Sequence, residues 1–478
     1  MQRITYIFSL GLFCSLLGSC KKQLDVYPTT TEVDGNVIVD TKSAASVLSG
    51  VYYRLANAGF DYNNVPAVMW VDVKEGYPSE MSGLFNYGYG GGSDLSSYTY
   101  KANSNEALSM WTYGYNLVNA ANGFLENVAP VTTIPDSTKR EMIAEAKFLR
   151  AYGDTYLLLN FGQYYDTTSP YGIILRSQFV TDVSIAQPRS SVGAAYDTIL
   201  ADLSSAIPDL AGVNTSPAWT NAWAAKLLEA RLLINRGGPA DYASVVSLTS
   251  DIIQHSPFSL EGNVEDIFRT KGLSSTEVIL GIQPYTSPLQ TYKFNEYLYY
   301  NQFVLTDSAV SLFSNDPRRS WTYYVGDFTA YGLGYQGVFT KYFPGDTTNP
   351  TATPITEYSY AFRLTEAYLL EAEALSEEGG DLITARSLLK TVMGHAGFTD
   401  FTAVDAETTA AGLQDLVIRE EIKNFMGEDG QDWLAARRWP FATLQAWAPA
   451  MVSKDLLILP IPQKEVQGNG LVTQNPGY

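Results

Sequence analysis

The sequence predicts a mainly α protein: a scaffold of helical hairpins, interrupted by long irregular loop-rich excursions, with a few short strands. Three observations support this fold class. A helix that ends in two glycines occurs twice, amphipathic helical periodicity recurs along most of the chain, and two long stretches rich in aromatic residues, proline and glycine lack that periodicity. A chain of 478 residues is also long enough to bury a large core.

The repeated helix covers residues 225–238 and 367–380, and eight of the 14 aligned positions are identical. Both copies are rich in Ala and Leu and stop at a glycine pair, a frequent C-terminal signal. A turn at Gly380-Asp381 and a second helix follow the later copy. This pattern resembles a tetratricopeptide hairpin. The alternative is that two amphipathic helices share a composition.

Residues 1–19 are predicted to be a signal peptide that is removed. Arg3 supplies a positive end, and the apolar run over residues 4–17 is shorter than the roughly 20 residues of a membrane-spanning helix. Residues 17–20 resemble the lipobox of bacterial lipoproteins, which implies acylation of Cys20; ordinary secretion is the alternative. Residues 20–40 would then be a lipidated tether, and no cysteine remains for a disulfide in the mature chain.

Charge and composition narrow the class of ligand. The chain carries 31 basic and 50 acidic side chains, a formal net charge of −19, which argues against nucleic acid because phosphate backbones attract cationic surfaces. Aromatic residues reach 13 %, with 33 tyrosines. A tyrosine offers a flat apolar face and a polar tip, which suits a ligand that is partly apolar and partly hydroxylated. Tyrosine also packs protein cores, so composition alone does not decide.

Helical periodicity divides the chain into parts. The predicted helices cover residues 42–58, 104–127, 136–159, 190–207, 219–236, 240–254, 359–378, 381–395, 410–426 and 430–437. They define a helical scaffold over residues 41–255 and a tetratricopeptide-like continuation over residues 359–440. In the third of these helices Gly153 is expected to let a neighbouring helix approach closely. The tail, residues 441–478, is predicted to be extended because its prolines oppose a helix.

The two excursions cover residues 59–100, within the first helical region, and residues 256–358, a loop-rich insert. Both are rich in aromatic rings, whereas disordered segments are poor in them. Long irregular loops on a rigid scaffold often carry function. We therefore expect both excursions to lie on the surface and to form one binding site together.

The predicted ligand contacts are ring faces from both excursions and the polar side chains near them. The rings are Trp70, Phe85, Tyr87, Tyr89, Tyr299, Tyr300 and Trp321, and the polar candidates are Asn86, Asn301, Asp316 and Arg318. A sugar ring has an apolar C–H face that can stack on an aromatic ring, while its hydroxyls bond to amides and charges. For each ring taken alone, burial beneath a loop is the competing interpretation.

The sequence offers no catalytic or metal-binding constellation. The two histidines, His255 and His395, stand apart, and neither a zinc motif nor a nucleophile elbow occurs. The adjacent acids Glu420-Glu421 point about 100° apart on a helix, whereas a glycosidase needs its pair across a cleft. We therefore expect a binding protein that is not an enzyme and uses no metal or cofactor.

Several separated stretches match one family, in that family's order along the chain. They are Cys20 with residues 24–28, residues 144–152 with Tyr156 and residues 160–162, Phe362-Arg363 with Glu366 and residues 371–375, and residues 419–422, 437–439, 459–465 and 474–478. Together these stretches resemble the SusD/RagB-like outer-membrane lipoproteins of Bacteroidetes. Each motif is weak alone, but the ordered set covers essentially the whole chain.

The resemblance implies a tetratricopeptide core with a loop-rich ligand face, its helical side turned toward a SusC-like TonB-dependent transporter. It also implies a lipid-anchored position on the outer surface of the outer membrane. One departure concerns the family pattern Glu-Gly-x-Arg-x-x-Asp-Leu, whose Arg and Asp positions are Asp432 and Ala435 here. This suggests an internal ion pair lost as a unit. The other departure is that Lys21-Lys22, rather than a run of acids, follows Cys20.

The function that the resemblance implies is capture of an oligosaccharide and its delivery to the transporter, without catalysis. An oligopeptide-capturing subunit of the RagB type is the alternative, and the sequence does not separate the two ligand classes. A tetratricopeptide scaffold that binds only proteins is a third interpretation, which the two long aromatic excursions make less attractive.

Overall fold

A computed structural model describes residues 37–56, 59–60, 66–67, 70–90, 92–181, 184–283, 292–377 and 379–478. The predicted signal peptide, Cys20 and the tether up to residue 36 lie outside this part. Within it the chain is mainly helical with short strands, as predicted. No described helix is long and apolar enough to cross a membrane.

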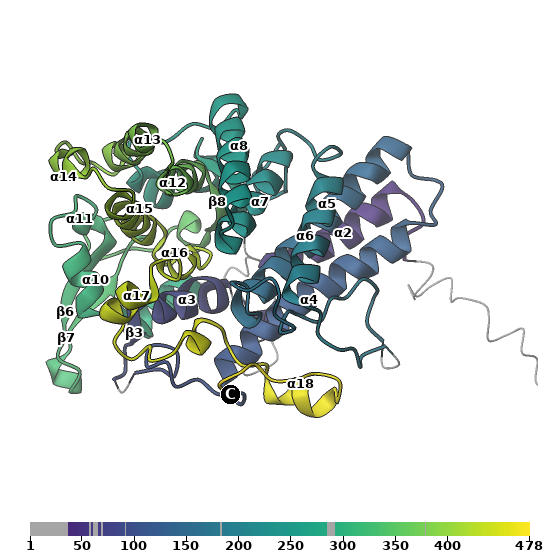
Figure 1. Cartoon of the computed structure of the whole chain (residues 1–478), viewed down its shortest axis with the longest axis horizontal. Helices are drawn as coiled ribbons and strands as arrows, with labels where there is room; N and C mark the ends of the chain where they lie inside the picture. The colour runs from purple at the N-terminus through teal and green to yellow at the C-terminus, as the bar shows by residue number, and fades with distance from the viewer. Residues whose placement is uncertain are drawn as a thin grey trace, which may run out of the picture.

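Helical hairpins form the framework of the molecule (Figure 1). The long helices are α2 (Thr41–Ala56), α4 (Asn105–Val128), α5 (Asp136–Phe161), α6 (Val192–Ala206), α7 (Ala222–Arg236), α8 (Pro239–His255), α12 (Leu364–Leu375), α13 (Leu382–His395) and α15 (Ala410–Phe425). Helix α4 packs on α5, α7 on α8, and α8 on α12, which also packs on α13 and α15. The helices predicted over these residues are confirmed, with shifts at their ends.

Local sequence sets where these helices begin and end. The Asn221 side chain caps α7 by accepting a backbone hydrogen bond, and Gly237 ends that helix in the left-handed region at φ 71°. Asp381 caps α13 by accepting from two backbone N–H groups. The glycine stop predicted for the earlier copy is therefore confirmed, whereas in the later copy α12 already ends at Leu375, before the glycine pair.

Shorter elements connect the hairpins. They are η2 (Val71–Gly76), α3 (Tyr77–Met81), η3 (Ile267–Lys271), η4 (Gly272–Ser274), α9 (Tyr292–Phe294), η5 (Asn295–Tyr299), α10 (Asp307–Leu312), α11 (Arg319–Thr322), η6 (Thr329–Tyr331), η7 (Pro354–Glu357), α14 (Thr402–Ala406), α16 (Gln431–Ala436), α17 (Phe441–Trp447), η8 (Lys454–Leu457) and α18 (Gln463–Gly468). Helices α17 and α18 correct the prediction of an extended tail. Pro440 and Pro462 precede them at positions where a helix does not need the missing N–H.

The strands form three small sheets. They are β1 (Gly59–Phe60), β2 (Pro66–Ala67), β3 (Phe85–Tyr87), β4 (Val278–Ile282), β5 (Phe303–Leu305), β6 (Tyr323–Asp327), β7 (Tyr335–Phe339) and β8 (Ser359–Arg363). Strand β8 corrects the predicted helix start at residue 359. All five of its residues are buried and it pairs antiparallel with β4, so long-range pairing decides its conformation and α12 begins only at Leu364.

Much of the first excursion is buried, which corrects the prediction of a surface loop. Every residue from 70 to 76 is buried, although three of them are charged. Lys74 Nζ lies 2.7 Å from Asp429 Oδ1, and Glu75 Oε1 lies 3.0 Å from Lys293 Nζ. These partners are far away in the sequence, so local periodicity could not reveal that the segment is interior.

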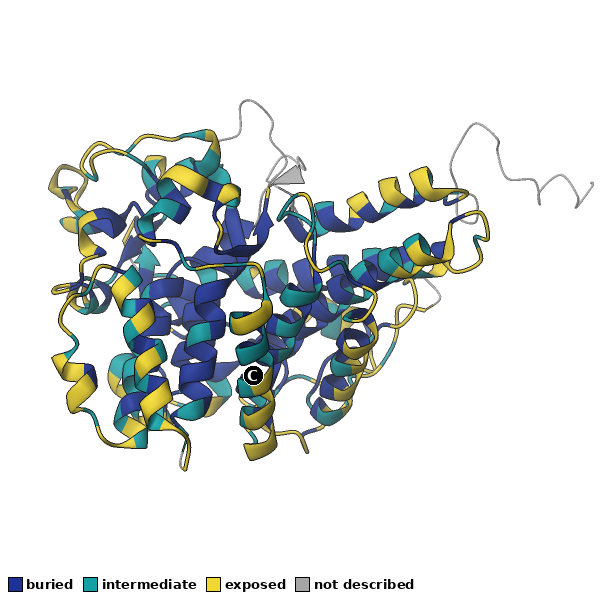
Figure 2. Ribbon diagram, turned by 90° about the horizontal axis from the view of Figure 1, so that it is seen from above, coloured by how far each residue is buried: buried dark blue, intermediate teal, exposed yellow. Residues whose placement is uncertain are grey.

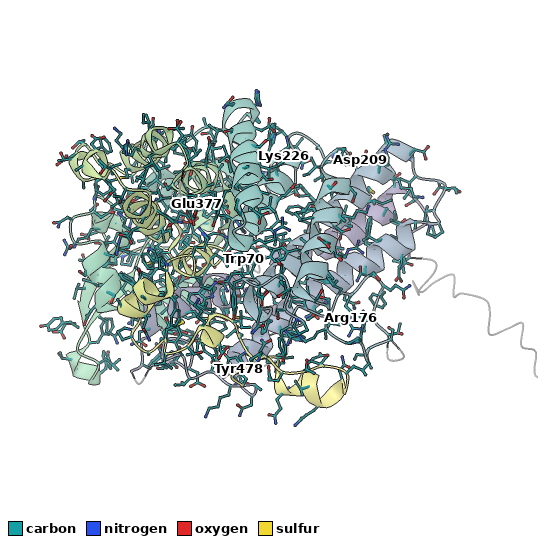
Figure 3. All side chains as sticks on the ribbon, viewed as in Figure 1. Trp70, Arg176, Asp209, Lys226, Glu377 and Tyr478 are labelled. Atoms are coloured by element: carbon teal, nitrogen blue, oxygen red, sulfur yellow. The ribbon has the colours of Figure 1, made fainter. Side chains whose placement is uncertain are left out.

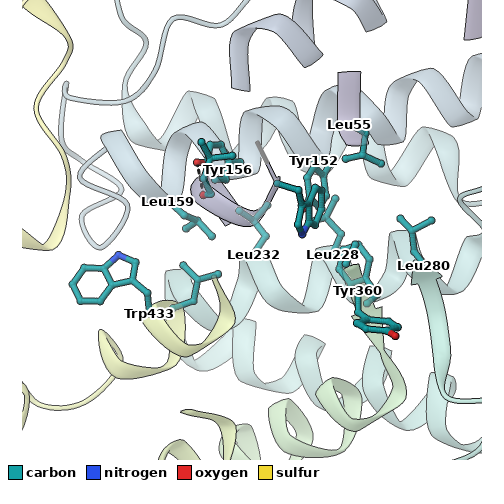
Figure 4. Packing of buried hydrophobic residues seen from close by; sticks show 14 of the residues in the cluster. Leu55, Tyr152, Tyr156, Leu159, Leu228, Leu232, Leu280, Tyr360 and Trp433 are labelled. Atoms are coloured by element: carbon teal, nitrogen blue, oxygen red, sulfur yellow. Dashed lines mark hydrogen bonds between the residues drawn. The ribbon is translucent and has the colours of Figure 1, made fainter. Parts of the chain in front are cut away.

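The core runs through the hairpins, with buried residues on the inward sides of the helices and exposed ones outside (Figure 2). Tyr152 of α5, Leu228 of α7 and Trp433 of α16 belong to one cluster (Figure 4). As predicted, Gly153 allows close helix packing, because a Cβ there would lie 2.8 Å from Val118 Cγ2 on α4.

Buried ion pairs connect the separate parts of this core. Arg231 on α7 holds Glu366 on α12 (Nε–Oε1 2.7 Å) and Asp429 before α16 (Nη1–Oδ2 2.6 Å). The second oxygen of Asp429 binds Lys74 of η2. The burial of these charges is tolerated because each one has an opposite charge in contact.

Candidate functional site

The two excursions meet in one antiparallel sheet of strand order β3-β5-β7-β6. Strand β3 belongs to the first excursion, and the other three strands belong to the second. In the pairing of β3 with β5, Phe85 lies opposite Leu305 and Tyr87 lies opposite Phe303. The prediction that the excursions come together is thus confirmed.

One side of this sheet rests on buried rings. The Phe85 ring centroid lies 6.2 Å from that of Phe303 and 5.0 Å from that of Phe339, which is itself 5.0 Å from Tyr297. Phe85 is fully buried, so the prediction that it offers an open ring face is corrected. Phe85 therefore fixes β3 to the second excursion and belongs to the layer of buried rings beneath the sheet.

Four tyrosines lie at the surface of the junction: Tyr87, Tyr89, Tyr299 and Tyr300, together called the tyrosine face. Ring centroids are 5.5 Å apart in the Tyr87–Tyr89 pair and 5.0 Å apart in the Tyr299–Tyr300 pair. Tyr89, Tyr299 and Tyr300 are 51 %, 71 % and 47 % exposed, and Tyr87 is half-buried. Partial burial raises the pKa of Tyr89, and the ionisable groups of Tyr87, Glu296, Tyr300 and Tyr299 raise it further.

A close backbone contact holds the two tyrosine pairs together. Gly88 N donates to Gln302 O at 2.9 Å, and a Cβ at Gly88 would lie only 1.7 Å from Asn301 O. Gln336 accepts from Asn301 Nδ2 (2.8 Å) and donates to Gly88 O (2.6 Å). Asn301, a predicted ligand contact, is 8 % exposed and in the left-handed region at φ 50°, and its Nδ2 group serves the junction.

Asn86 is half-buried beside the tyrosine face. Its Oδ1 accepts from Tyr87 N (2.9 Å) and from Ser96 Oγ (3.1 Å). These two bonds fix the orientation of the amide, so Asn86 is a polar group of defined direction next to the exposed rings.

Asp316 and Arg318 form a buried ion cluster with α15, which corrects their placement in an open site. The Arg318 Nε and Nη2 atoms donate to the two Asp316 oxygens (2.8 and 2.6 Å), and Arg318 Nη1 donates to Glu420 Oε1 (2.7 Å). Burial opposes a charge on Asp316, but the bonds and charge of Arg318 outweigh it and lower the pKa of Asp316 to about 2. The cluster attaches the insert to the helical framework.

Trp70 and Trp321 are core residues, so the prediction that they offer open ring faces is also corrected. Trp70 is 1 % exposed and packs between Tyr113 and Tyr152, with centroids 6.4 and 6.5 Å away (Figure 3 shows it in the interior). Trp321 is 6 % exposed and stacks on Phe268 at 6.1 Å. Trp70 thereby packs the first excursion against α4 and α5, and Trp321 packs within the second excursion.

Two exposed rings near the sheet were missed as candidates. Tyr331 ends η6, between β6 and β7, and Tyr335 begins β7; they are 79 % and 72 % exposed. Gly88 and Gln336 were also missed, although they hold the junction. The alternation Tyr87-Gly88-Tyr89 could have indicated a tight approach, whereas no local signal distinguishes Gln336.

The acidic residues considered for catalysis serve different contacts. Glu420 Oε1 lies 2.7 Å from Arg318 Nη1, while Glu421 Oε2 pairs with Arg438 Nη2. The two carboxylates therefore bind separate guanidinium groups and do not face each other across a cleft. Across the described residues, no group of three or more His, Cys, Asp and Glu side chains is placed to hold a metal ion.

Two family models match the chain. One, described as "Starch-binding associating with outer membrane", covers residues 73–231, and the other, described as "SusD family", covers residues 315–455. A SusD-like protein of Bacteroides ovatus is 25 % identical over 357 residues, which are 72 % of this chain and 59 % of that protein. SusD-like protein P25 of Formosa agariphila is 26 % identical over 171 residues, 35 % of this chain and 30 % of that protein. Each match thus spans less than two thirds of the relative's length.

Solved structures share the fold. A SusD superfamily protein of Bacteroides thetaiotaomicron superposes with a TM-score of 0.73 at 19 % identity, covering 92 % of this chain and 100 % of the other. A laminarin-binding SusD-like protein gives a TM-score of 0.70 at 18 % identity, also covering 92 % and 100 %. The two family matches, the SusD-like relatives and the common fold agree with the ordered motifs of the sequence: the chain belongs to the SusD/RagB-like family.

Proposed function

We propose that this protein is a surface lipoprotein of the outer membrane that captures an oligosaccharide on its tyrosine face and delivers it to a SusC-like TonB-dependent transporter. It catalyses no reaction. The observation that carries the proposal is the junction between β3 and β5, where two segments far apart in the sequence bring two pairs of tyrosines together, three of them exposed and Tyr87 half-buried.

The chemistry of the tyrosine face suits a glycan. Exposed phenol rings offer apolar faces to the C–H faces of sugars and hydroxyls to their polar edges. The buried rings of Phe85, Phe303 and Phe339 hold the face in place, which lowers the cost of ordering it on binding. Two further findings support the proposal: a structural neighbour binds laminarin, and one family model is described as starch-binding at the outer membrane.

A glycan array followed by calorimetry tests the proposal on the mature chain from Lys21 onward. We expect the double variant Tyr89→Ala, Tyr299→Ala to bind the selected glycan at least about tenfold more weakly, because each lost stacking ring removes roughly 0.5–1.5 kcal/mol beyond its burial. Phe179→Ala is the matched control, since Phe179 is a surface aromatic residue (39 % exposed) outside the tyrosine face.

The outcomes separate the competing functions. Full affinity in the double variant would mean that the glycan does not bind on the tyrosine face. Saturable binding of oligopeptides without any response to glycans would support the RagB-type alternative. A stable complex with the transporter in the absence of any small ligand would indicate a scaffold that binds only proteins.

A further inference from the structure

A groove of about 430 Å³ is lined mainly by the segments that follow α5, α7 and α16 and by the start of α17. These segments are separate in the sequence from the strands of the tyrosine-face sheet. No residue of the tyrosine face lines it. Its walls include Tyr164, Tyr165, Trp439 and Phe441, and its volume is in the range of small-molecule sites. A ligand with a ring and a polar group would fit such walls.

Two residues that line this groove carry polar hydrogens without an acceptor. Arg437 is 5 % exposed and donates only through Nη1, to the carbonyl oxygens of Leu457 (3.0 Å) and Leu159, while its Nε and Nη2 atoms are unpartnered. Trp439 Nε1 is also buried and unpartnered. In the described part of the chain, five buried side-chain N–H donors have no acceptor, and three of these five belong to residues that line this groove. The other two are Trp70 Nε1 and Arg269 Nε. Buried donors are normally satisfied.

The free edge of Arg437 is the edge that binds carboxylates elsewhere in this molecule. Through Nε and Nη2, Arg231 holds both oxygens of Glu366, and Arg318 holds both oxygens of Asp316. This bidentate geometry matches carboxylates and phosphates, and within this chain it is used for carboxylates. In Arg437 the same pair of atoms has no carboxylate.

The charge of the groove is also favourable for an anion. Its charged lining residues are Arg437, Arg438, Lys454 and Glu373, three basic and one acidic in a chain of net charge −19. Arg438 is already held by two carboxylates, Glu373 at 2.7 Å and Glu421, so the basic lining residues that remain for a ligand are Arg437 and Lys454. Burial without a carboxylate partner, reinforced by the charge of Arg438, lowers the pKa of Arg437. The Arg437 guanidinium lies over the rings of Tyr164 (4.3 Å) and Trp433 (5.1 Å), and a bound anion would supply the counter-charge that these rings do not provide.

We propose that this groove is a second ligand site, which binds the carboxylate of a uronic acid sugar. The carboxylate accepts from Arg437 Nε and Nη2, Trp439 Nε1 donates to a further oxygen, and the sugar ring lies against Tyr165. Lys454, which is exposed at the rim, adds long-range attraction.

Calorimetry of the mature chain with D-glucuronate, its methyl ester and D-glucose tests this assignment. We expect saturable binding of glucuronate, and binding of the ester and of glucose at least about tenfold weaker, because neither can give Arg437 the charged, bidentate acceptor of a carboxylate. Added salt should weaken glucuronate binding. Equal binding of acid and ester, or no saturable binding of the acid, would overturn the proposal.

Variants then locate the site. Arg437→Lys keeps the charge but removes the bidentate edge, and Trp439→Phe keeps a ring but removes the donor, so each should weaken glucuronate binding several-fold. Wild-type affinity in both variants would overturn the proposal. Because Arg437 also holds two backbone carbonyls, Trp439→Phe keeps the test valid if Arg437→Lys fails to fold. The exposed Lys42→Gln is the control and should bind glucuronate like the wild type.

Discussion

Asp432 shows how a single residue can replace an ion pair. It occupies the position of the arginine in the family pattern, and the paired aspartate position is the fully buried Ala435. Asp432 Oδ2 accepts from Ser79 Oγ (2.5 Å) and Ser82 Oγ (3.1 Å) of the first excursion. Burial raises the pKa of Asp432 to about 7, although both serines lower it. Two hydroxyls and a retained proton thus substitute for a counter-charge.

The Asp432→Asn variant should change how stability depends on pH. The folded chain binds this proton more tightly than the unfolded chain, so the wild type is fully stabilised below about pH 4 and loses that stability as pH rises through about 7. The amide cannot ionise, so the variant should gain up to about 4 kcal/mol relative to the wild type at pH 8 but little at pH 4. Urea unfolding at both pH values measures this, with the exposed Asp94→Asn as control. An equal difference at both pH values would contradict the prediction.

The exposure of individual rings was the least predictable property of the site. Trp70 and Trp321 are buried, whereas Tyr89 and Tyr299 are exposed, yet all four occur in similar irregular segments. Indole and phenol rings both have an apolar body and a polar tip, so a Trp or Tyr side chain can lie in the core or at a ligand-binding surface. What decides is which distant segment covers the ring, and that information is not local.

The junction between β3 and β5 is the element on which the tyrosine face depends. The sequence predicted that the two excursions would meet because both are rich in rings, but it did not predict a sheet. Strand pairing at Phe85 and the backbone contact at Gly88 are interactions across a large sequence separation. Helices were predicted better because their apolar residues recur every 3–4 positions within one segment.

Gly88→Ala should disconnect the two tyrosine pairs while the helical framework persists. The new Cβ would lie 1.7 Å from Asn301 O, so the backbone must move apart there. We expect faster amide hydrogen exchange in residues 85–90 and 299–305 and loss of glycan binding, with unchanged helical circular dichroism. Gly50→Ala on α2 is the control, since a Cβ there meets nothing within 4 Å and should stabilise the helix by roughly 0.5–1 kcal/mol. Unaltered exchange in both segments would show that the contact is dispensable.

The ion pairs between helices provide a second prediction for the elements. Arg231→Met leaves the buried carboxylates of Glu366 and Asp429 without their guanidinium, which should destabilise the fold by roughly 3–5 kcal/mol. Arg140→Met is the matched control, because its pair with Asp209 is exposed and should contribute less than about 1 kcal/mol. Urea unfolding measures both, and a similar small effect for both variants would argue against the importance of burial.

At the scale of the whole molecule, the fold class and the helical framework were predicted, while the route of the chain through the core was not. Residues 70–76 looked like a surface loop because their charges are neutralised by Asp429 and Lys293, far along the chain. The insert is likewise attached to α15 by a charge pair between residues far apart in the sequence, Arg318 and Glu420. Sequence patterns report local geometry and miss charge pairs of this kind.

The proposed lipid anchor at Cys20 gives a prediction at the scale of the intact protein. Cys20→Ser should abolish acylation and shift the protein from the membrane fraction to the soluble fraction, because the acyl chains supply the membrane affinity. Metabolic labelling with palmitate and membrane fractionation measure the two effects. Cys14→Ser is the control and should still be labelled. Continued labelling of the Cys20→Ser variant would show that acylation occurs elsewhere.

The ion pairs of Asp429 make it difficult to divide this protein into two fragments that fold independently. Its two oxygens neutralise Lys74 from the first excursion and Arg231 from α7, although it lies near the far end of the chain. A fragment that stops after α8 would therefore keep both cations in its interior with no anion, and the complementary fragment would keep the anion alone. We expect neither half to fold when produced separately, and co-production of both halves in one cell to restore the native assembly.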